Sequence, residues 1–317
     1  MLPQQFQKIT HNGVRGMILA RLETGSSAWL NDVAMRMQSD QASEEYAWLG
    51  TAPALREFIG GRTPAELREL SFVVSNKDYE GSLTFKSKDM RRDKLGMIQI
   101  RVNQLADRAL DHPAKLISTL IVAGESTTCY DGQYFFDTDH VEGASGVQSN
   151  SIVYDISDAG TGGTAAAPAV DTIAGAILEA IQQMYTFKDD RGEPMNQGAS
   201  KFTVMVPITY MSVALLAVTS LLVGGGNTNL LPALRGKFEI DVVPNPRLTW
   251  TTKLAVFRTD DAAKPFIIQE ETIPDVIALG EGSEYEKLNK EQLFGIDWTG
   301  NVAYAYWQDA CLVTLQA

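Results

Sequence analysis

"GMIQIRVNQLADRALDHPAKLISTLIVAG", residues 96–124, carries the longest helical pattern of this 317-residue chain. Its apolar side chains recur at helical spacing on both sides of one proline. They are Ile98, Val102, Leu105 and Ala109, and then Leu116, Leu120 and Ile121. One continuous helix would extend about 40 Å at 1.5 Å per residue. Pro113 interrupts helical hydrogen bonding, so we predict a kink or a division there, with Asp111 capping the second half.

The segment before this helix predicts a β-hairpin. "SFVVSNK" and "GSLTFKSK", residues 71–77 and 81–88, alternate apolar and polar side chains on either side of "NKDYEG". Such alternation is typical of strands, and the intervening residues favour a turn. A two-stranded ribbon with so few apolar side chains is marginal by itself. We therefore expect this hairpin to rest on another surface.

Residues 1–45 show only a short helical pattern, near residues 22–37, and we interpret them as an arm that needs a partner surface. The next segment, residues 46–70, predicts two short helices, the second capped by Thr63 and begun by Pro64. Both segments precede the hairpin. They extend the chain at its beginning without predicting a core of their own.

The second half of the chain predicts an α+β lobe. A loop rich in Gly, Ser, Ala and Thr, residues 142–170, leads to an amphipathic helix that Asp171 is expected to cap. Strand, helix and strand patterns follow in residues 201–244, with short strands in residues 253–259 and 265–271. Residues 294–315 alternate apolar and smaller side chains, and we interpret them as one long terminal strand.

Composition excludes several classes of protein. The content is 44% hydrophobic and 21% charged, which is typical of globular chains. We expect neither a membrane span nor a secretory signal, and Cys129 and Cys311 are too far apart for a CxxC motif. The net charge of −12 disfavours a protein that grips nucleic acid through phosphate contacts. Residues 260–291 alone carry −6, from nine acids and three lysines, whereas residues 1–36 and 76–94 each carry +2.

The best candidate for chemistry is "DGQYFFDTDH", residues 131–140. The stretch contains four side chains of types that bind metal ions: Asp131, Asp137, Asp139 and His140. Sets of carboxylates and histidines bind the metal of metal-dependent hydrolases. The chain lacks HExxH, GxSxG, Walker and GxGxxG motifs. The structural interpretation, which we favour, is that Asp131 and Gly132 form a tight turn, the aromatic residues fill a core, and the later aspartates bond to backbone N–H groups.

Several segments, in this order, resemble the major head subunit family of Mu-like tailed phages. They are "WLGTAPALREFIG", "NKDYEGSL", "HPAKLISTLIVAG" and "CYDGQYFFDTDH", with looser resemblance in "FTVMVPITYMSVALL" and "LRGKFEIDVVPNP". The resemblance implies an α+β fold, the capsid fold named after phage Hong Kong 97. It assigns residues 1–45 to an N-terminal arm, 46–70 to the first part of a peripheral domain, 71–95 to an extended β-hairpin loop, 96–130 to the spine helix, 131–284 to an axial domain, and 285–317 to a C-terminal strand returning to the peripheral domain.

The same resemblance implies a major capsid protein that forms pentamers and hexamers of an icosahedral head around double-stranded DNA. It implies no enzymatic activity and no cofactor, and it suggests scaffolding, portal and decoration proteins as partners, with DNA contacted non-specifically. Assembly would occur in the bacterial cytoplasm, and the chain would end in the virion. The alternatives are a metal-dependent hydrolase and another virion structural protein.

Two sets of residues follow from this expectation. Candidate contacts between subunits are charged: Lys77, Lys86, Lys88, Arg91, Arg92, Arg15, Arg21, Glu281, Glu284 and Glu286. The basic members are expected to meet the acidic window of a neighbouring copy. An architectural crossover between two domains is expected at Asp131, Gly132, Phe135, Phe136, Asp137, Asp139 and His140.

Overall fold

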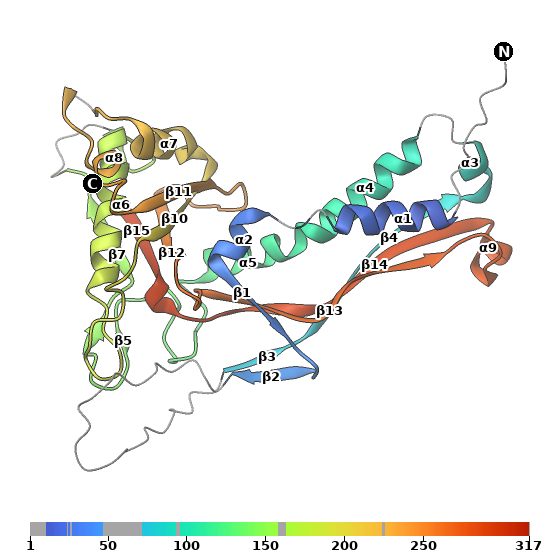
Figure 1. Ribbon diagram of the computed structural model, residues 1–317, viewed down its shortest axis with the longest axis horizontal. Helices are drawn as coiled ribbons and strands as arrows, with labels where there is room; N and C mark the ends of the chain where they lie inside the picture. Colours follow the sequence, from blue (N-terminus) through green and yellow to red (C-terminus); the bar gives the residue numbers. More distant parts are fainter. Residues whose placement is uncertain are drawn as a thin grey trace, which may run out of the picture.

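The computed structural model describes residues 11–23, 25, 27–46, 72–92, 96–157, 163–223 and 226–316. Two β-sheets organise these residues, and they lie at opposite ends of an elongated molecule (Figure 1). We call the part at one end the α/β lobe and the part at the other end the elongated domain. In the described segments, no helix is long and apolar enough to cross a bilayer.

The elongated domain contains a four-stranded sheet in the order β1-β13-β14-β4. β13 (Phe266–Leu279) and β14 (Glu291–Tyr304) form a long antiparallel hairpin, with α9 (Glu284–Asn289) at its tip. β4 (Lys77–Lys86) pairs antiparallel with β14, and β1 (Ala34–Gln38) pairs parallel with β13. α4 (Met97–Leu110) and α1 (His11–Leu22) lie along this sheet, and α3 (Ser87–Arg92) follows β4 near the tip.

The α/β lobe contains a five-stranded sheet in the order β11-β10-β12-β15-β7. Its strands are β7 (Ser151–Asp155), β10 (Lys201–Val206), β11 (Glu239–Pro244), β12 (Lys253–Arg258) and β15 (Ala310–Gln316). α6 (Val170–Tyr185) packs on the sheet. The short helix η1 (Ile208–Tyr210) leads into α7 (Met211–Thr219), and α8 (Leu230–Ala233) follows; Figure 1 shows α7 and α8 at the top of the lobe.

Smaller elements connect these two parts. α2 (Ala28–Val33) and α5 (His112–Ala123) lie between them, and η3 (Trp307–Asp309) links β14 to β15. Three short antiparallel pairs complete the described structure. They are β2 (Ser43–Tyr46) with β3 (Phe72–Ser75), β5 (His140–Val141) with β6 (Val147–Gln148), and β8 (Gly163–Thr164) with β9 (Ala167–Pro168).

The predicted division of the long helix is confirmed. α4 ends at Leu110 and α5 begins at His112, directly before Pro113, which has no N–H to donate to the preceding turn. Asp111 occupies the capping position, but its side chain makes no capping hydrogen bond. The other predicted cap is also displaced, because α6 begins at Val170 with Ala169, not Asp171, at its N-cap.

The predicted hairpin of residues 71–95 is wrong. Residues 77–86 form one uninterrupted strand through the expected turn, and Lys86 lies opposite Glu291 of β14 rather than opposite residues of its own segment. β3 pairs with β2 instead. The alternation correctly indicated extended chain, but it carries no information about which strand is the partner.

Two further boundaries need correction. The predicted axial segment, 131–284, includes β13, which belongs to the elongated domain. The predicted terminal strand is two strands in different sheets, β14 and β15, and β15 lies in the α/β lobe between β12 and β7. Part of the predicted loop of residues 142–170 is β7 of that sheet. The local pattern could not show which sheet a strand joins, because pairing is decided by residues far apart in sequence.

The N-terminal segment does not lack a surface in its own chain. α1 packs against α4, and Val14 and Ile18 are fully buried with Val102 in a small core of the elongated domain. Leu30 of α2 is also fully buried, in the main core. The expectation of an arm without intrachain packing is therefore wrong for these residues. Residues 1–10 and most of the predicted segment 46–70 lie outside the described residues.

Candidate functional site

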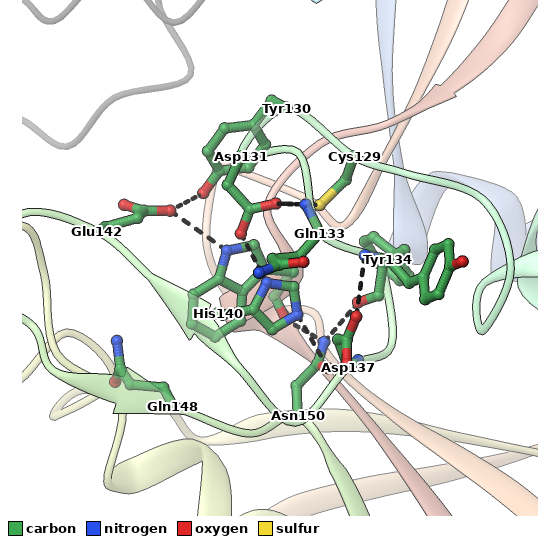
Figure 2. A network of polar contacts seen from close by, with 12 residues as sticks. Cys129, Tyr130, Asp131, Gln133, Tyr134, Asp137, His140, Glu142, Gln148 and Asn150 are labelled. Carbon is green, nitrogen blue, oxygen red and sulfur yellow. Dashed lines mark hydrogen bonds and ion pairs between the residues drawn. The ribbon is translucent and has the colours of Figure 1, made fainter.

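The stretch quoted as a possible catalytic site follows α5 and contacts both parts of the molecule. Phe135 packs against residues of β13 and β14, while His140 packs against Trp307, which lies between β14 and β15. We call residues 129–150 the junction. Figure 2 shows its network of polar contacts.

Asp131 is the centre of the first set of contacts. One carboxylate oxygen lies 2.6 Å from His140 Nδ1. The other accepts hydrogen bonds from the Cys129 thiol at 3.0 Å and from the Gln133 backbone N–H at 3.0 Å. Gly132, which lies between Asp131 and Gln133 in the sequence, has a positive φ of 87°, and glycine adopts this angle without strain. The predicted turn at Asp131 and Gly132 is thus confirmed.

His140 is fully buried. Both of its ring nitrogens make polar contacts, and one face of its ring stacks on another ring. Its Nε2 lies 3.3 Å from Asn150 Oδ1, and its ring stacks on Trp307 with centroids 4.0 Å apart and planes 7° apart. The Asn150 amide donates to the carbonyls of Phe135 at 2.8 Å and Trp307 at 3.2 Å, and its oxygen accepts from the Asp137 N–H at 2.9 Å. Asn150 therefore ties the junction to η3.

Electrostatics make this group of side chains unreactive. Burial by itself raises the pKa of Asp131, but the hydrogen bonds from His140 and Cys129 outweigh it and hold the pKa below its usual value. Burial, and then the neighbouring Asp131 charge, raise the pKa of the Cys129 thiol far above neutrality. A thiol that stays protonated is a poor nucleophile.

A second buried set surrounds Glu142. Its carboxylate accepts hydrogen bonds from the Tyr130 hydroxyl, from Gln308 Nε2 at 2.8 Å and from Trp307 Nε1 at 3.2 Å. Burial raises the pKa of Glu142, and these donors oppose that rise. Gln308 and Trp307 belong to η3, so this set again joins the junction to the connection between β14 and β15.

Phe135 and Phe136 of the stretch fill the core between the two parts, whereas the prediction is wrong for Tyr134, which is 44% exposed. Phe135 is fully buried and stacks on Tyr304 of β14, with centroids 4.5 Å apart and planes 15° apart. It also lies 5.2 Å from the Phe266 ring of β13 and 4.9 Å from that of Phe136. A Cβ on Gly124 would lie 2.5 Å from the Phe136 ring, so the end of α5 approaches it closely.

Of the metal set predicted as an alternative, the structure brings Asp131 and His140 together, but Asp137 and Asp139 do not join them. Asp137 accepts hydrogen bonds from two backbone N–H groups of its own turn, and Asp139 is exposed. Within the described ranges, the ligand-type atoms that do gather, within 4.8 Å of one another, are those of Cys129, Asp131 and His140. These atoms already hydrogen-bond to one another, as a structural network does.

The basic contact candidates are distributed over the elongated domain. Arg15 and Arg21 are on α1, where Arg21 pairs with Asp107 of α4 at 2.5 Å. Lys77 and Lys86 mark the two ends of β4, and Lys88, Arg91 and Arg92 belong to α3. With the exception of Arg91, whose side chain is not described, all of these side chains are exposed.

The acidic candidates lie around the tip of the same domain. Lys86, Lys88 and Glu286 line one cavity of about 610 Å³. Basic and acidic candidates are therefore already neighbours within one chain. Glu286 accepts hydrogen bonds from Ser87 Oγ at 2.6 Å and from the Gly282 N–H at 2.7 Å, whereas Glu281 and Glu284 are exposed.

Sequence reasoning missed an exposed apolar surface on the α/β lobe. Seven large apolar side chains of η1, α7, α8 and the segment between α7 and α8 are exposed. They are Ile208, Met211, Leu215, Leu216, Leu221, Leu222 and Leu230, with exposed fractions from 39% to 71%. We call them the apolar patch. The signal was present in "MSVALLAVT", a helix that is apolar on every side although the lobe can cover only one side.

Comparison with known proteins agrees with the resemblance seen in the sequence. Residues 11–165 match the model of the family described as Mu-like prophage major head subunit gpT. This match covers 155 residues, just under half of the 317-residue chain. The chain is 36% identical over 136 residues to the Mu-like prophage FluMu major head subunit of Haemophilus influenzae, which is 43% of this chain and 44% of that protein. It is 34% identical over 129 residues to the major capsid protein of Escherichia phage Mu, which is 39% and 42% of the two chains. The matched region thus spans less than half of either Mu-like relative.

Solved structures extend the similarity beyond that region. The procapsid of bacteriophage JBD30 is matched with a TM-score of 0.54 and 22% identity, over 96% of this chain and 73% of the other. The capsid of cyanophage P-SCSP1u is matched with a TM-score of 0.55 and 12% identity, over 92% and 89%. At such low identity the similarity concerns the fold. The expected Hong Kong 97-like capsid fold is thereby confirmed.

Proposed function

We propose that this chain is a major capsid protein. Many copies form pentamers and hexamers, and these close into an icosahedral phage head around packaged double-stranded DNA. The family match of residues 11–165 and the capsid fold of nearly the whole chain support this proposal. We infer that copies assemble in the bacterial cytoplasm, with scaffolding, portal and decoration proteins as partners, and that DNA is contacted without sequence preference.

The apolar patch is the observation that carries self-assembly. Seven large apolar side chains at one end of a chain with net charge −12 are costly to leave in water. Several large apolar side chains exposed on neighbouring elements favour a protein interaction site. We propose that the lobe is the axial domain and that the patch faces the same lobe of adjacent copies within a pentamer or hexamer.

We assign the peripheral role to the elongated domain and the crossover role to the junction. Asp131 and His140 connect through Asn150 and Trp307 to the segment that leaves β14 and enters β15. With Phe135 packed on β13 and β14, the junction would hold the two domains at a defined angle. A shell requires such an angle, because curvature depends on how adjacent copies are oriented.

The extension that reaches a neighbouring copy is reassigned to the β2–β3 pair. Gln269 of β13, which is fully buried, anchors this pair. Its Oε1 accepts from the Tyr46 hydroxyl at 2.8 Å, and its Nε2 donates to the Val74 carbonyl at 3.1 Å. The pair has further attachments, because Asn301 Nδ2 donates to the Ser75 carbonyl at 2.7 Å and both Tyr46 and Val74 are buried in the main core. A neighbouring copy would supply an additional surface for this two-stranded pair.

The experiment compares two pairs of equally exposed residues. Leu221→Ser with Leu222→Ser changes the apolar patch, where these side chains are 71% and 59% exposed. Val147→Ser with Val153→Ser changes side chains on β6 and β7 that are 72% and 57% exposed and lie outside the apolar patch. Sedimentation velocity and negative-stain electron microscopy should show capsomers or shells for the wild type and the valine variant, and monomers for the leucine variant. A wild-type chain that stayed monomeric with and without a scaffolding partner would refute the proposed function.

A further inference from the structure

A groove crosses the elongated domain between α4 and the sheet. Its volume is about 440 Å³. The floor is apolar, built from Tyr79 and Leu83 of β4, Leu105 of α4, and Ile296 and Trp298 of β14. The proposed contacts around the capsomer axes use the other end of the molecule, so this groove has no part in them.

An unsatisfied polar atom lies in the lining of the groove. The His112 ring is 4.3 Å from that of Tyr79 and 5.5 Å from that of Trp298. Its Nε2 is buried, and no described residue forms a hydrogen bond with it. Buried polar atoms in native proteins nearly always have a partner. The described residues therefore leave one polar atom beside the groove without a partner.

Two arginines of α4 and one acid, Glu80 of β4, line the groove, so its positive charges exceed its negative charge by one. Arg101 and Arg108 lie seven residues apart on α4, about 10 Å along the helix, with Leu105 between them. Arg101 contacts Gln104 at 3.3 Å, and among the described residues neither arginine forms an ion pair with an acid. On a chain of net charge −12, two such arginines beside an apolar floor favour an occupant that is both acidic and apolar.

The tip of the β13–β14 hairpin carries exposed glutamates and a large exposed apolar side chain, together with the exposed Lys287 and Lys290. Glu284 and Leu288 lie four residues apart on α9 and share one face, and Glu281 precedes the helix. Leu288 is 75% exposed, and both glutamates are exposed. In the described part of the chain no ion pair involves Glu281 or Glu284.

The tip is also preformed and held away from the groove of its own chain. Glu286 accepts hydrogen bonds from Ser87 Oγ at 2.6 Å and from Gln292 Nε2 at 3.2 Å. Ser283 Oγ caps the helix by accepting from the Glu286 N–H at 3.1 Å. Because α9 is fastened to the start of α3, it can fill only the groove of a second copy. A preformed tip loses little conformational entropy on binding.

We propose that the groove binds the α9 tip of a second copy, with Leu288 against the apolar floor and the two exposed glutamates facing Arg101 and Arg108. This inference rests on the proposed function, and it adds a contact that joins copies through their elongated domains. Each copy supplies one groove and one tip, so the contact can form in a closed symmetric set. It would connect capsomers that the apolar patch has already built.

Charge reversal tests the contact between groove and tip. Because every copy carries both surfaces, one variant chain can hold the substitutions on either side or on both. The groove variant is Arg101→Glu with Arg108→Glu, and the tip variant is Glu281→Arg with Glu284→Arg. Each should lose closed particles and keep capsomers in sedimentation velocity and electron microscopy, more strongly at low salt. The four-fold combination restores opposite charges and should recover particles. Arg191→Glu, an exposed basic residue outside the groove, is the control and should assemble normally.

The outcomes separate this inference from the proposed function. A groove or tip variant that assembles like the wild type would overturn the inference, and so would a four-fold combination that fails to recover particles. Leu288→Ser gives an independent arm, because a side chain so exposed contributes little to folding, and it should also lose particles. A wild type that forms no capsomers would refute the proposed function, together with this contact.

Discussion

Replacing Phe135 by alanine tests whether the junction holds the two domains together. The side chain is fully buried and stacks on Tyr304, with Phe266 and Phe136 against its other sides. Removing a buried phenylalanine ring costs about 3–5 kcal/mol, of which each lost aromatic pair accounts for about 0.5–1.5 kcal/mol. Because a domain is stable by only about 5–15 kcal/mol, Phe135→Ala should lose a large share of the free energy of unfolding.

The adjacent residue provides a matched control. Tyr134 is 44% exposed, so Tyr134→Ala should change the free energy of unfolding by about 0.5 kcal/mol or less. Urea denaturation at concentrations where the chain is monomeric, followed by tryptophan fluorescence and circular dichroism, measures both variants. A loss below about 1 kcal/mol for Phe135→Ala, or equal losses for the two variants, would show that Phe135 does not anchor the junction.

Two other substitutions test buried polar groups. Burial raises the pKa of Asp309 from 3.8 to about 7, although the charge of Arg258 opposes this rise. Between these two pH values the folded state keeps a proton that the unfolded state has lost. The free energy of unfolding therefore falls as pH rises through this range. Asp309→Asn should remove this fall, so the unfolding free energies of wild type and variant should differ more at about pH 8 than at about pH 4.5. An equal difference at both pH values would contradict the raised pKa of Asp309. Tyr46→Phe leaves the buried Oε1 of Gln269 without its donor and should cost about 1–3 kcal/mol. Hydrogen exchange should accelerate in β2 and β3, and unchanged protection there would argue against the anchor.

Some features of the site could be predicted because they depend on a few adjacent residues. Pro113 lacks an N–H, so a kink or a division follows from the residue itself, and the structure shows a division. Gly132 adopts a positive φ in the turn that Asp131 completes with its own side chain. Both predictions used interactions within one or two turns of chain, and both are confirmed.

The partners of the junction could not be predicted in the same way. His140 was noticed beside three aspartates, yet its contacts include Asn150 and Trp307, which is more than 160 residues away in sequence. A histidine near carboxylates is compatible with a metal site or a buried network. The choice depends on burial and on which donors face each oxygen, and neither property is written in the local pattern.

What the sequence determined by itself is local: the course of α4 and α5, the extended chain of residues 77–86, the turn at Gly132 and the resemblance to Mu-like head subunits. The tertiary structure alone decided that residues 77–86 pair with β14, that β14 and β15 enter different sheets, and that seven apolar side chains near α7 stay exposed. The reason is the range of the forces. Helix period, proline and glycine act through bonds and neighbours a few residues apart, whereas strand pairing and burial minimise the exposed surface of the whole chain.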